Sequence, residues 1–561
     1  MESRSLTEMK NSKSSPWILL LVILVCLLPT VFFMCMDTYR TGDEIVTYGM
    51  ANEPECGWMF SKGRIRAYID TAILGDGVSG IPGNLIAAGK DILTNRKNAA
   101  FFQMERPSET GWYTKEQMQG YTAIMEGEAF HPGDIYLNGM GDDANSFLYY
   151  LCLHLVSSLF PQISATKWSG FLLNLIFLAI SLLLLYRIAS RYVQTEGQRY
   201  GILVAYACSI AAVSTFTNIR PYALTIVMQE WLLLLHLKML EVYERNGMDG
   251  ARKYIRRLIP AYIVGYISHY TTGIWAVSLA VFIIVSVPKE KAFLRSYFRA
   301  GILAVFLGIV VDPMSVLGLL SKLKGTESDG LIAAYHTMLL DWIRGIFGNP
   351  IWLVPAGVLC IIAVFRFRNT DNRGLVREYL RFPALPVFYM LLSVFLMKTV
   401  KIATVLPYFF VVFGMLVFYA AGEKKLWKKI LTGLCFLLWA GGMFAGLVRE
   451  KKEERKDYLL LEEQMAGYGQ DHIVFLRDHG AGYDKIPLLG NYERIYLWTA
   501  DEGWEDYGTE AKQALQDGGL VLIDGAPEKL WEEAEKLCLT DGETAEVLLQ
   551  NDQFMLVNIK R

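Results

Sequence analysis

The sequence carries little charge for its length. Of its 561 residues, 20% are charged and 53% are hydrophobic, and the mean hydropathy is +0.28. A soluble globular chain usually has about a quarter charged residues and a smaller apolar share. This composition excludes a disordered chain, a collagen-like chain and an ordinary cytosolic enzyme. A formal net charge of −2 gives no bulk field that attracts nucleic acid, so no nucleic-acid partner is expected.

Cysteine and glycosylation patterns are also sparse. Six of the eight cysteines lie in apolar runs, and only Cys56 and Cys538 lie in polar segments. This distribution gives neither a disulfide framework nor zinc-ligand spacing, so no metal ligands are predicted, although a divalent cation is left open as a cofactor. The chain has no Asn-x-Ser/Thr sequon, which favours a bacterial plasma membrane over an endoplasmic reticulum.

Long apolar runs dominate what is present. A spanning helix needs roughly 20 apolar residues, and the first run, 17–36, has that length without a small-x-small cleavage site, so it is interpreted as an uncleaved span. The further runs lie at 167–186, 200–217, 220–240, 258–287, 300–320, 351–365, 382–397, 403–421 and 430–448. The chain is therefore predicted to be a polytopic α-helical membrane protein.

The distribution of Lys and Arg decides two ambiguous segments. If 146–160 lies at the surface and 258–287 forms two short helices that meet near His269, six connections with 24 Lys and Arg fall on one side, against 7 in the short connections on the other side. Basic loops favour the cytoplasm. This predicts about eleven spans, a cytoplasmic N-terminus and an extracytoplasmic C-terminus.

Two water-soluble parts follow from this topology. The membrane domain covers 1–448 and includes a large outer loop with surface helices at 37–160. The tail, 449–561, has strand-like runs at 473–476, 494–498 and 520–523 and a helix-like run at 527–539. Strands separated by a helix indicate a small α/β domain. The tail has no Gly-x-Gly-x-x-Gly or Walker motif, so it is interpreted as a binding or structural module.

Two outer segments carry acidic residues. Thr41-Gly42-Asp43-Glu44 follows the first span and forms either a helix-capping box or a catalytic carboxylate site at the membrane edge. The stretch Gly141 to Tyr150 contains Asp143 and precedes His154. It forms either a helix cap with an interfacial aromatic belt or part of a site.

Cations gather at the predicted outer turns. Arg220, between two spans, either extends its charge to the interface or binds an anion. His269 and the pair Lys398 and Lys401 lie at other outer turns. His269 is either a structural residue or a ligand of the same anion, and the two lysines are either interfacial anchors or ligands of that anion. The intramembrane acids are Glu230 and Asp312, which are functional candidates by default.

These residues form the set that inverting glycosyl transfer from a lipid phosphate requires. The leaving group is already a phosphate, so it needs cations more than a general acid. The acceptor hydroxyl needs one carboxylate base within hydrogen-bond reach, and the lipid tail needs a cavity among apolar helices.

The same segments resemble the GT-C superfamily of polyprenyl-phosphate-sugar-dependent glycosyltransferases, in particular bacterial relatives of protein O-mannosyltransferases and lipid A aminoarabinose transferases. Asp43-Glu44 resembles the acidic pair of the first outer loop. The segment from Asp143 to Tyr150 resembles an Asp-x-His-Pro-Pro-Leu-Tyr-Tyr stretch, although Asn-Ser-Phe replaces His-Pro-Pro here. Lys167 stands where the family usually has Arg, and Arg220-Pro-Tyr-Ala-Leu resembles an Arg-x-Tyr-Ala-Leu turn.

The resemblance implies roles for these residues. Asp43 would be the catalytic base, Glu44 would support it and Asp143 would belong to the catalytic set. Arg220, with Lys398, Lys401 and His269, would bind the donor phosphate.

The expected activity is transfer of a sugar from a polyprenyl-phosphate carrier to a cell-envelope glycan, lipid or protein on the extracytoplasmic face. Two alternatives remain. A lipid-linked-sugar flippase or transporter would use Glu230 and Asp312 as relays, although the chain lacks the paired halves typical of transporters. A polysaccharide polymerase or ligase would be another outer-face enzyme. The sequence specifies neither the sugar nor the acceptor.

Overall fold

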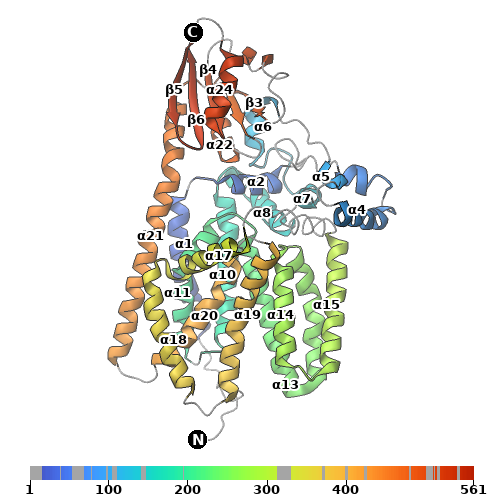
Figure 1. Cartoon of the computed structure of the whole chain (residues 1–561), viewed down its shortest axis with the longest axis vertical. Coiled ribbons are helices and arrows are strands. Elements are labelled where there is room, and N and C mark those ends of the chain that lie inside the picture. Colours follow the sequence, from blue (N-terminus) through green and yellow to red (C-terminus); the bar gives the residue numbers. More distant parts are fainter. Residues whose placement is uncertain are drawn as a thin grey trace. The chain divides into compact units, whose positions relative to one another are not determined.

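The computed structural model (Figure 1) describes residues 15–37, 39–53, 68–77, 79–95, 99–103, 110–140, 147–193, 195–312, 330–368, 373–397, 402–421, 426–469, 471–478, 482–500, 509–510, 512–514, 519–539 and 544–560. The chain forms two compact units. The membrane unit comprises 1–36, 143–149 and 171–450, and the soluble unit comprises 37–142, 150–170 and 451–561. The sequence instead grouped the outer loop with the membrane domain; in the structure the loop clusters with the tail.

The membrane unit is helical in its described residues. Its elements are α1 (Pro16–Met36), α10 (Trp168–Ala189), α11 (Glu196–Ala207), α12 (Ile210–Thr217), α13 (Tyr222–Tyr266), α14 (Thr271–Ser286), α15 (Lys291–Val311), α17 (Leu331–Phe347), η4 (Pro350–Trp352), α18 (Leu353–Arg368), α19 (Arg373–Met397), η5 (Ile402–Val405), α20 (Leu406–Ala421) and the first part of α21 (Leu426–Ala466).

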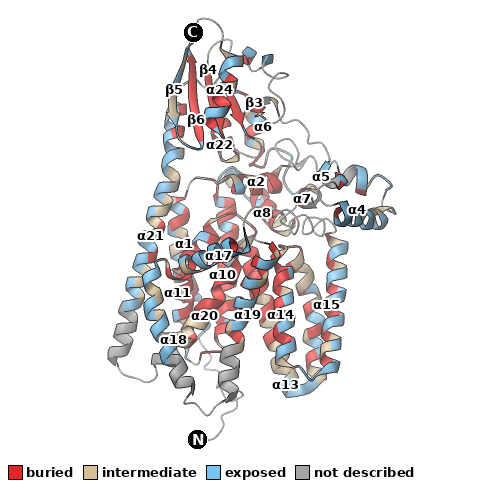
Figure 2. Cartoon of the chain, viewed as in Figure 1, coloured by how far each residue is buried: buried red, intermediate tan, exposed pale blue. Residues whose placement is uncertain are grey.

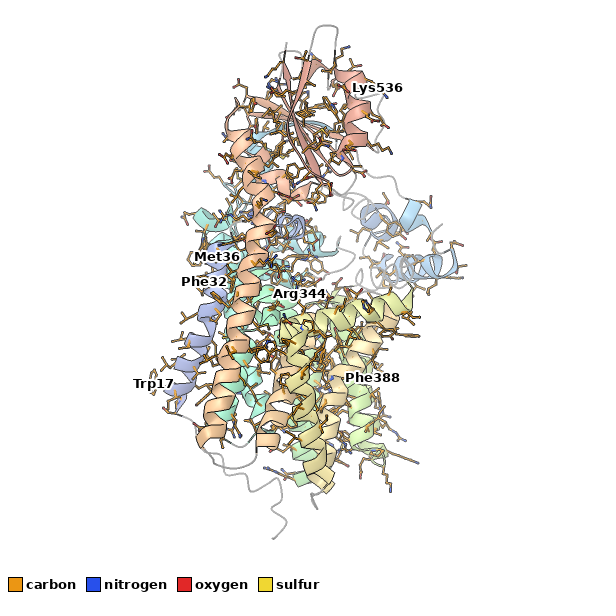
Figure 3. The ribbon with its side chains drawn as sticks, turned by 60° about the vertical axis from the view of Figure 1, so that its left-hand side comes forward. Trp17, Phe32, Met36, Arg344, Phe388 and Lys536 are labelled. Carbon is orange, nitrogen blue, oxygen red and sulfur yellow. The ribbon has the colours of Figure 1, made fainter. Side chains whose placement is uncertain are left out.

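Large apolar side chains cover the outside of these helices. Trp17 is 76% exposed, Ile302 70% and Val354 69%, and Figure 3 shows Trp17 on the outer side of α1. Figure 2 shows exposed residues along α15 and α18. Because water would penalise so much exposed apolar surface, lipid is the solvent that fits it.

Helix lengths support several membrane crossings. Among the described residues, four helices are long and apolar enough to span a bilayer, and two bent pairs raise this to six. Shorter apolar helices add to them, including α14 and part of α19. The eleven spans and the sidedness of the loops stay predictions.

Two breaks divide the segment from Tyr222 to Ser286, and the sequence predicted the second of them. α13 contains a kink at Gly247, whose φ of 62° suits a residue without a Cβ. α13 ends at Tyr266 and α14 begins at Thr271, so the segment 258–287 is two helices, as expected. α8 (Leu148–Leu159) has 12 residues, about 18 Å of helix, which is too short to cross the roughly 30 Å hydrocarbon core.

The soluble unit combines the outer loop and the tail. The loop and the segment 150–170 supply α2 (Gly42–Asn52), η2 (Ile69–Ile73), α4 (Ile81–Asn95), α5 (Ala100–Gln103), β1 (Gly111–Thr114), α6 (Lys115–Gly120), α7 (Pro132–Met140), most of α8 and α9 (Pro161–Ser164). The tail supplies β2 (His472–Arg477), η6 (Tyr483–Lys485), α22 (Ile486–Leu489), β3 (Arg494–Thr499), β4 (Gly519–Asp524), α24 (Pro527–Cys538), β5 (Thr544–Gln550) and β6 (Phe554–Lys560).

A six-stranded sheet in the order β1-β3-β2-β4-β6-β5 organises this unit. β3, β2 and β4 are parallel, whereas β1, β6 and β5 pair antiparallel to their neighbours. β2, β3, β4 and α24 lie where the sequence predicted three strands and a helix, whereas β5 and β6 were not predicted. β1, which the sequence did not predict, is an outer-loop strand that pairs with β3.

Both faces of the four central strands, β3, β2, β4 and β6, are buried, whereas the edge strand β5 is mostly exposed (Figure 2). One face packs against Leu530, Trp531 and Ala534 of α24. The opposite face packs against the end of α21, against α22 and against two outer-loop elements, represented by Ile45 of α2 and Met118 of α6. The core of the tail is therefore completed by the outer loop.

Candidate active site

α2 begins with a complete capping box. The Thr41 Oγ1 accepts a hydrogen bond from the Glu44 N–H at 3.3 Å, and the Glu44 carboxylate accepts one from the Thr41 N–H at 2.9 Å. The capping interpretation is therefore confirmed for Thr41 and Glu44. The box is formed by Thr41 and Glu44, and Asp43 takes no part in it.

Glu44 also belongs to a buried ion network. The Lys167 Nζ lies 3.1 Å from the Glu44 Oε2 and 3.1 Å from Asp37 Oδ1, and it donates to the Tyr39 carbonyl at 2.8 Å. Lys451 pairs with the other Asp37 oxygen at 3.2 Å. Glu44 is 1% exposed and Lys167 6% exposed. Two carboxylates and two ammonium groups thus balance one another beneath the start of α2, as buried charges require.

Asp43 is exposed, in contrast to its neighbour. It lies in the first turn of α2, where the helix dipole favours a negative charge. Its backbone carbonyl accepts a hydrogen bond from the Thr47 Oγ1 at 2.9 Å. The network fixes Glu44 and leaves Asp43 accessible, which is the arrangement a general base needs toward an incoming hydroxyl.

The first turns of α2 are held against the segment before α10. The Tyr48 hydroxyl donates to the Thr166 carbonyl at 3.0 Å and accepts from Ser169 and Gly170 at 3.2 and 3.1 Å. The Arg40 guanidinium lies over the Tyr48 ring, 4.9 Å from its centroid, and donates to the Ala165 carbonyl. These contacts fix the height and rotation of α2, and therefore the direction in which Asp43 points.

His154 has a structural role. Its Nδ1 lies 2.8 Å from the Ala51 carbonyl, and its Nε2 accepts the His131 N–H at 3.0 Å. The Nδ1–H tautomer satisfies both bonds. Burial lowers the pKa of His154 below its usual value, because a charged ring would lose hydration. A neutral imidazole is therefore built into the packing of α8 against α2.

Arg220 lies in a turn that hydrogen bonds fix. In the membrane unit, Asn174 donates to the carbonyls of Phe216 and Asn218 at 3.1 and 2.9 Å, and it accepts from the Tyr149 hydroxyl at 2.9 Å. Arg220 is partly exposed, and its backbone N–H donates to the Asn218 carbonyl at 3.0 Å. The turn that carries this cation is thus tied to α8 and α10.

His269 lies beside the same turn. Its ring centroid is 5.4 Å from that of Tyr222 and 4.3 Å from that of Tyr270, and its Nδ1 is 2.7 Å from the Thr271 Oγ1. The structure thus brings His269 to the neighbourhood of Arg220, since Tyr222 follows Arg220 by two residues. The role of either residue stays a prediction.

The other candidates divide into two groups. Asp143, Lys398 and Lys401 lie outside the described residues. Glu230 is fully buried within α13, and Asp312, 1% exposed, caps the end of α15. Among the side chains that the structure describes, no group of three or more His, Cys, Asp or Glu is placed to hold a metal ion.

Sequence reasoning missed two charged residues of the network, Asp37 and Lys451, and also Arg40, which lies over the Tyr48 ring. Asp37 is 8% exposed and Arg40 is 7% exposed, and Lys451 is partly exposed, although each lies in a polar stretch of the sequence. Asp37 directly follows the first span, and Lys451 lies three residues after the last apolar run, which ends at position 448. A signal therefore existed in the position of each charge at a membrane boundary, but nothing in the sequence pairs them.

No protein-family model matches the chain, and no curated protein matches it either. Its structure is similar to the crystal structure of ArnT from Cupriavidus metallidurans bound to undecaprenyl phosphate, with a TM-score of 0.53 over 97% of this chain and 98% of that chain, at 10% identity. This likeness shows that the chain has an ArnT-like fold, in agreement with the fold that the sequence resemblance implied.

Proposed function

We propose that the protein is a membrane-embedded inverting glycosyltransferase that uses a polyprenyl-phosphate-linked sugar as donor and a cell-envelope molecule as acceptor. The observation that carries this proposal is the exposed Asp43 carboxylate at the head of α2, above a buried network that neutralises Glu44, in a chain with the fold of ArnT. ArnT was crystallised with undecaprenyl phosphate, which supports a carrier of that class.

The proposed reaction forms and breaks one bond to the sugar. The acceptor oxygen attacks the anomeric carbon while its proton moves to Asp43, and the bond from that carbon to the phosphate oxygen breaks. The carrier leaves as polyprenyl phosphate, and attack from the opposite side inverts the anomeric centre. Arg220, with His269, Lys398 and Lys401, stabilises the phosphate charge that develops. We place this chemistry on the extracytoplasmic face of a bacterial plasma membrane.

The experiment compares cells with and without the gene. Mass spectrometry of envelope glycans, lipids and proteins should show a sugar missing from one acceptor, and the lipid extract should show the matching polyprenyl-phosphate sugar accumulating. Purified protein should then transfer that sugar from the synthetic donor.

Other outcomes identify the rivals. A flippase would move the lipid-linked sugar across vesicles without forming a glycosidic bond, and a polymerase would extend chains rather than add one sugar. Unchanged envelope composition together with no transfer by the purified protein would overturn the proposal.

A further inference from the structure

α2 is built into the core of the tail's sheet. Ile45, which is fully buried, packs in the same cluster as Ile473 and Phe475 of β2 and Leu522 of β4. Ile45 follows Asp43 by two residues. The strands of the tail and the proposed base are therefore connected through one continuous apolar core, and a shift of the sheet face would move α2 with it.

The turn η6 contacts the start of α2 directly. A Cβ placed on Gly42 would lie 3.5 Å from the Tyr483 Cβ, an ordinary contact distance. η6 is itself fixed by Gly482, whose φ of 77° and whose closeness to the Phe475 ring exclude larger residues. The residue immediately before Asp43 thus rests on a turn whose backbone is constrained.

Polar contacts join the same turn to the segment before α2. The Tyr39 hydroxyl donates to the Asp484 Oδ2 at 2.8 Å. Lys485 pairs with Asp484 and, at 3.3 Å, with Asp524 at the end of β4. Burial, together with the Asp484 carboxylate, raises the pKa of Tyr39, so its hydroxyl remains a proton donor.

We infer that η6 is a positioning element for the proposed base, and that Tyr39 and Asp484 are its positioning residues: their hydrogen bond holds the segment 39–42, and thereby Asp43, in the orientation that proton transfer requires. This inference rests on the proposed function. A misplacement of about 1 Å at a reacting group costs roughly 10²-fold in rate. The tail then serves the reaction without touching either substrate.

The test uses the purified full-length chain with the synthetic donor and the acceptor identified from the envelope. Tyr39→Phe keeps the ring and removes the hydrogen bond to Asp484. We expect kcat to fall about 5- to 50-fold while KM for donor and acceptor stays within about twofold. Tyr492→Phe is the matched control, because it removes a buried hydroxyl that donates to the Met465 carbonyl at 3.3 Å in the same core; its kcat should stay near wild type.

A second background separates positioning from mere stabilisation. In Asp43→Asn, where no base is left to position, adding Tyr39→Phe should leave the residual rate unchanged. Asp484→Ala should reproduce the loss of kcat, and Asp484→Asn, which keeps an acceptor for the Tyr39 hydroxyl, should lose less; these variants carry the test if Tyr39→Phe does not fold.

Three results have different meanings. Wild-type kcat for both Tyr39→Phe and Asp484→Ala overturns the positioning role alone. A raised KM for the acceptor with unchanged kcat overturns it too, in favour of an acceptor-binding tail. Absence of transfer by the wild-type protein overturns the proposed function instead.

Discussion

Replacing Lys167 tests the buried network beneath α2 by removing its shared cation. Lys167→Met keeps the length of the side chain but leaves Glu44, 1% exposed, without the ammonium group 3.1 Å away. Asp37 retains its ion pair with Lys451 at 3.2 Å, so the substitution affects Glu44 more than Asp37. Removing one partner of a buried ion pair costs about 3–5 kcal/mol.

An exposed ion pair in the same unit provides the control. Lys115 and Glu493 are separated by 3.1 Å, but their side chains are 32% and 62% exposed, and such surface pairs contribute about 0.2–1 kcal/mol. Each kcal/mol shifts the Tm of a unit of this size by about 2–4 °C. We therefore expect Lys167→Met to lower Tm by about 6–20 °C and Lys115→Met by no more than about 4 °C.

Thermal unfolding of the purified protein in detergent, followed by intrinsic fluorescence, measures both variants under identical conditions. Adding Glu44→Gln to Lys167→Met should recover part of the loss, because the uncompensated charge is then gone. Equal, small shifts for Lys167→Met and Lys115→Met would refute the argument that this network is a buried, mutually dependent set.

Three further predictions follow from other parts of the structure. The folded protein keeps His154 neutral, so the unfolded state takes up an additional proton below about pH 6.5, and Tm should fall as the pH drops through that value. His154→Gln should flatten this part of the plot of Tm against pH. An unchanged plot would contradict the argument from burial. Arg220→Ala should weaken use of the polyprenyl-phosphate donor by about one to two decades, the worth of a charge-assisted contact, whereas unchanged donor saturation would remove Arg220 from the phosphate site. Alkaline phosphatase fused at Arg561 should be active, and green fluorescent protein fused at the same position should not fluoresce. The opposite pattern would contradict the predicted topology.

Local pattern was sufficient for much of the fold. Period and composition located β2, β3 and β4 because each is a short apolar run bounded by turn residues. The charge count placed the break near His269 because one long helix would have put two basic loops on opposite faces. The Gly247 kink was also accessible, since a basic polar stretch interrupts the apolar run there.

Long-range pairing was not accessible from one sequence. β1 has four residues and pairs with a strand almost 400 positions later, so no local signal distinguishes it from a loop. The hydrogen bond between Tyr39 and Asp484 also joins residues far apart in the sequence, so no local pattern predicts it. The tail appears autonomous in the sequence, but it takes part of its core from the outer loop. The sequence did not reveal this, because an apolar residue such as Ile45 is equally compatible with a surface helix.

The candidate site was predictable where chemistry and position coincide. Asp43 and Glu44 were chosen together, and both a cap and an exposed carboxylate are present. The residue pattern alone did not assign which acid does which task, and only the family resemblance implied that Asp43 is the base. Burial separates them: Glu44 is neutralised by Lys167, and Asp43 faces outward.

The most direct test of the central claim is the rate of sugar transfer by Asp43→Asn. Asn caps a helix about as well as Asp, so the variant should express, fold and bind the polyprenyl-phosphate donor like the wild type. Loss of a general base lowers a rate by about 10²–10⁴-fold, and we predict that decrease in kcat with the purified protein. Transfer by Asp43→Asn at a near wild-type rate would show that Asp43 is only part of the helix start and would contradict the catalytic assignment.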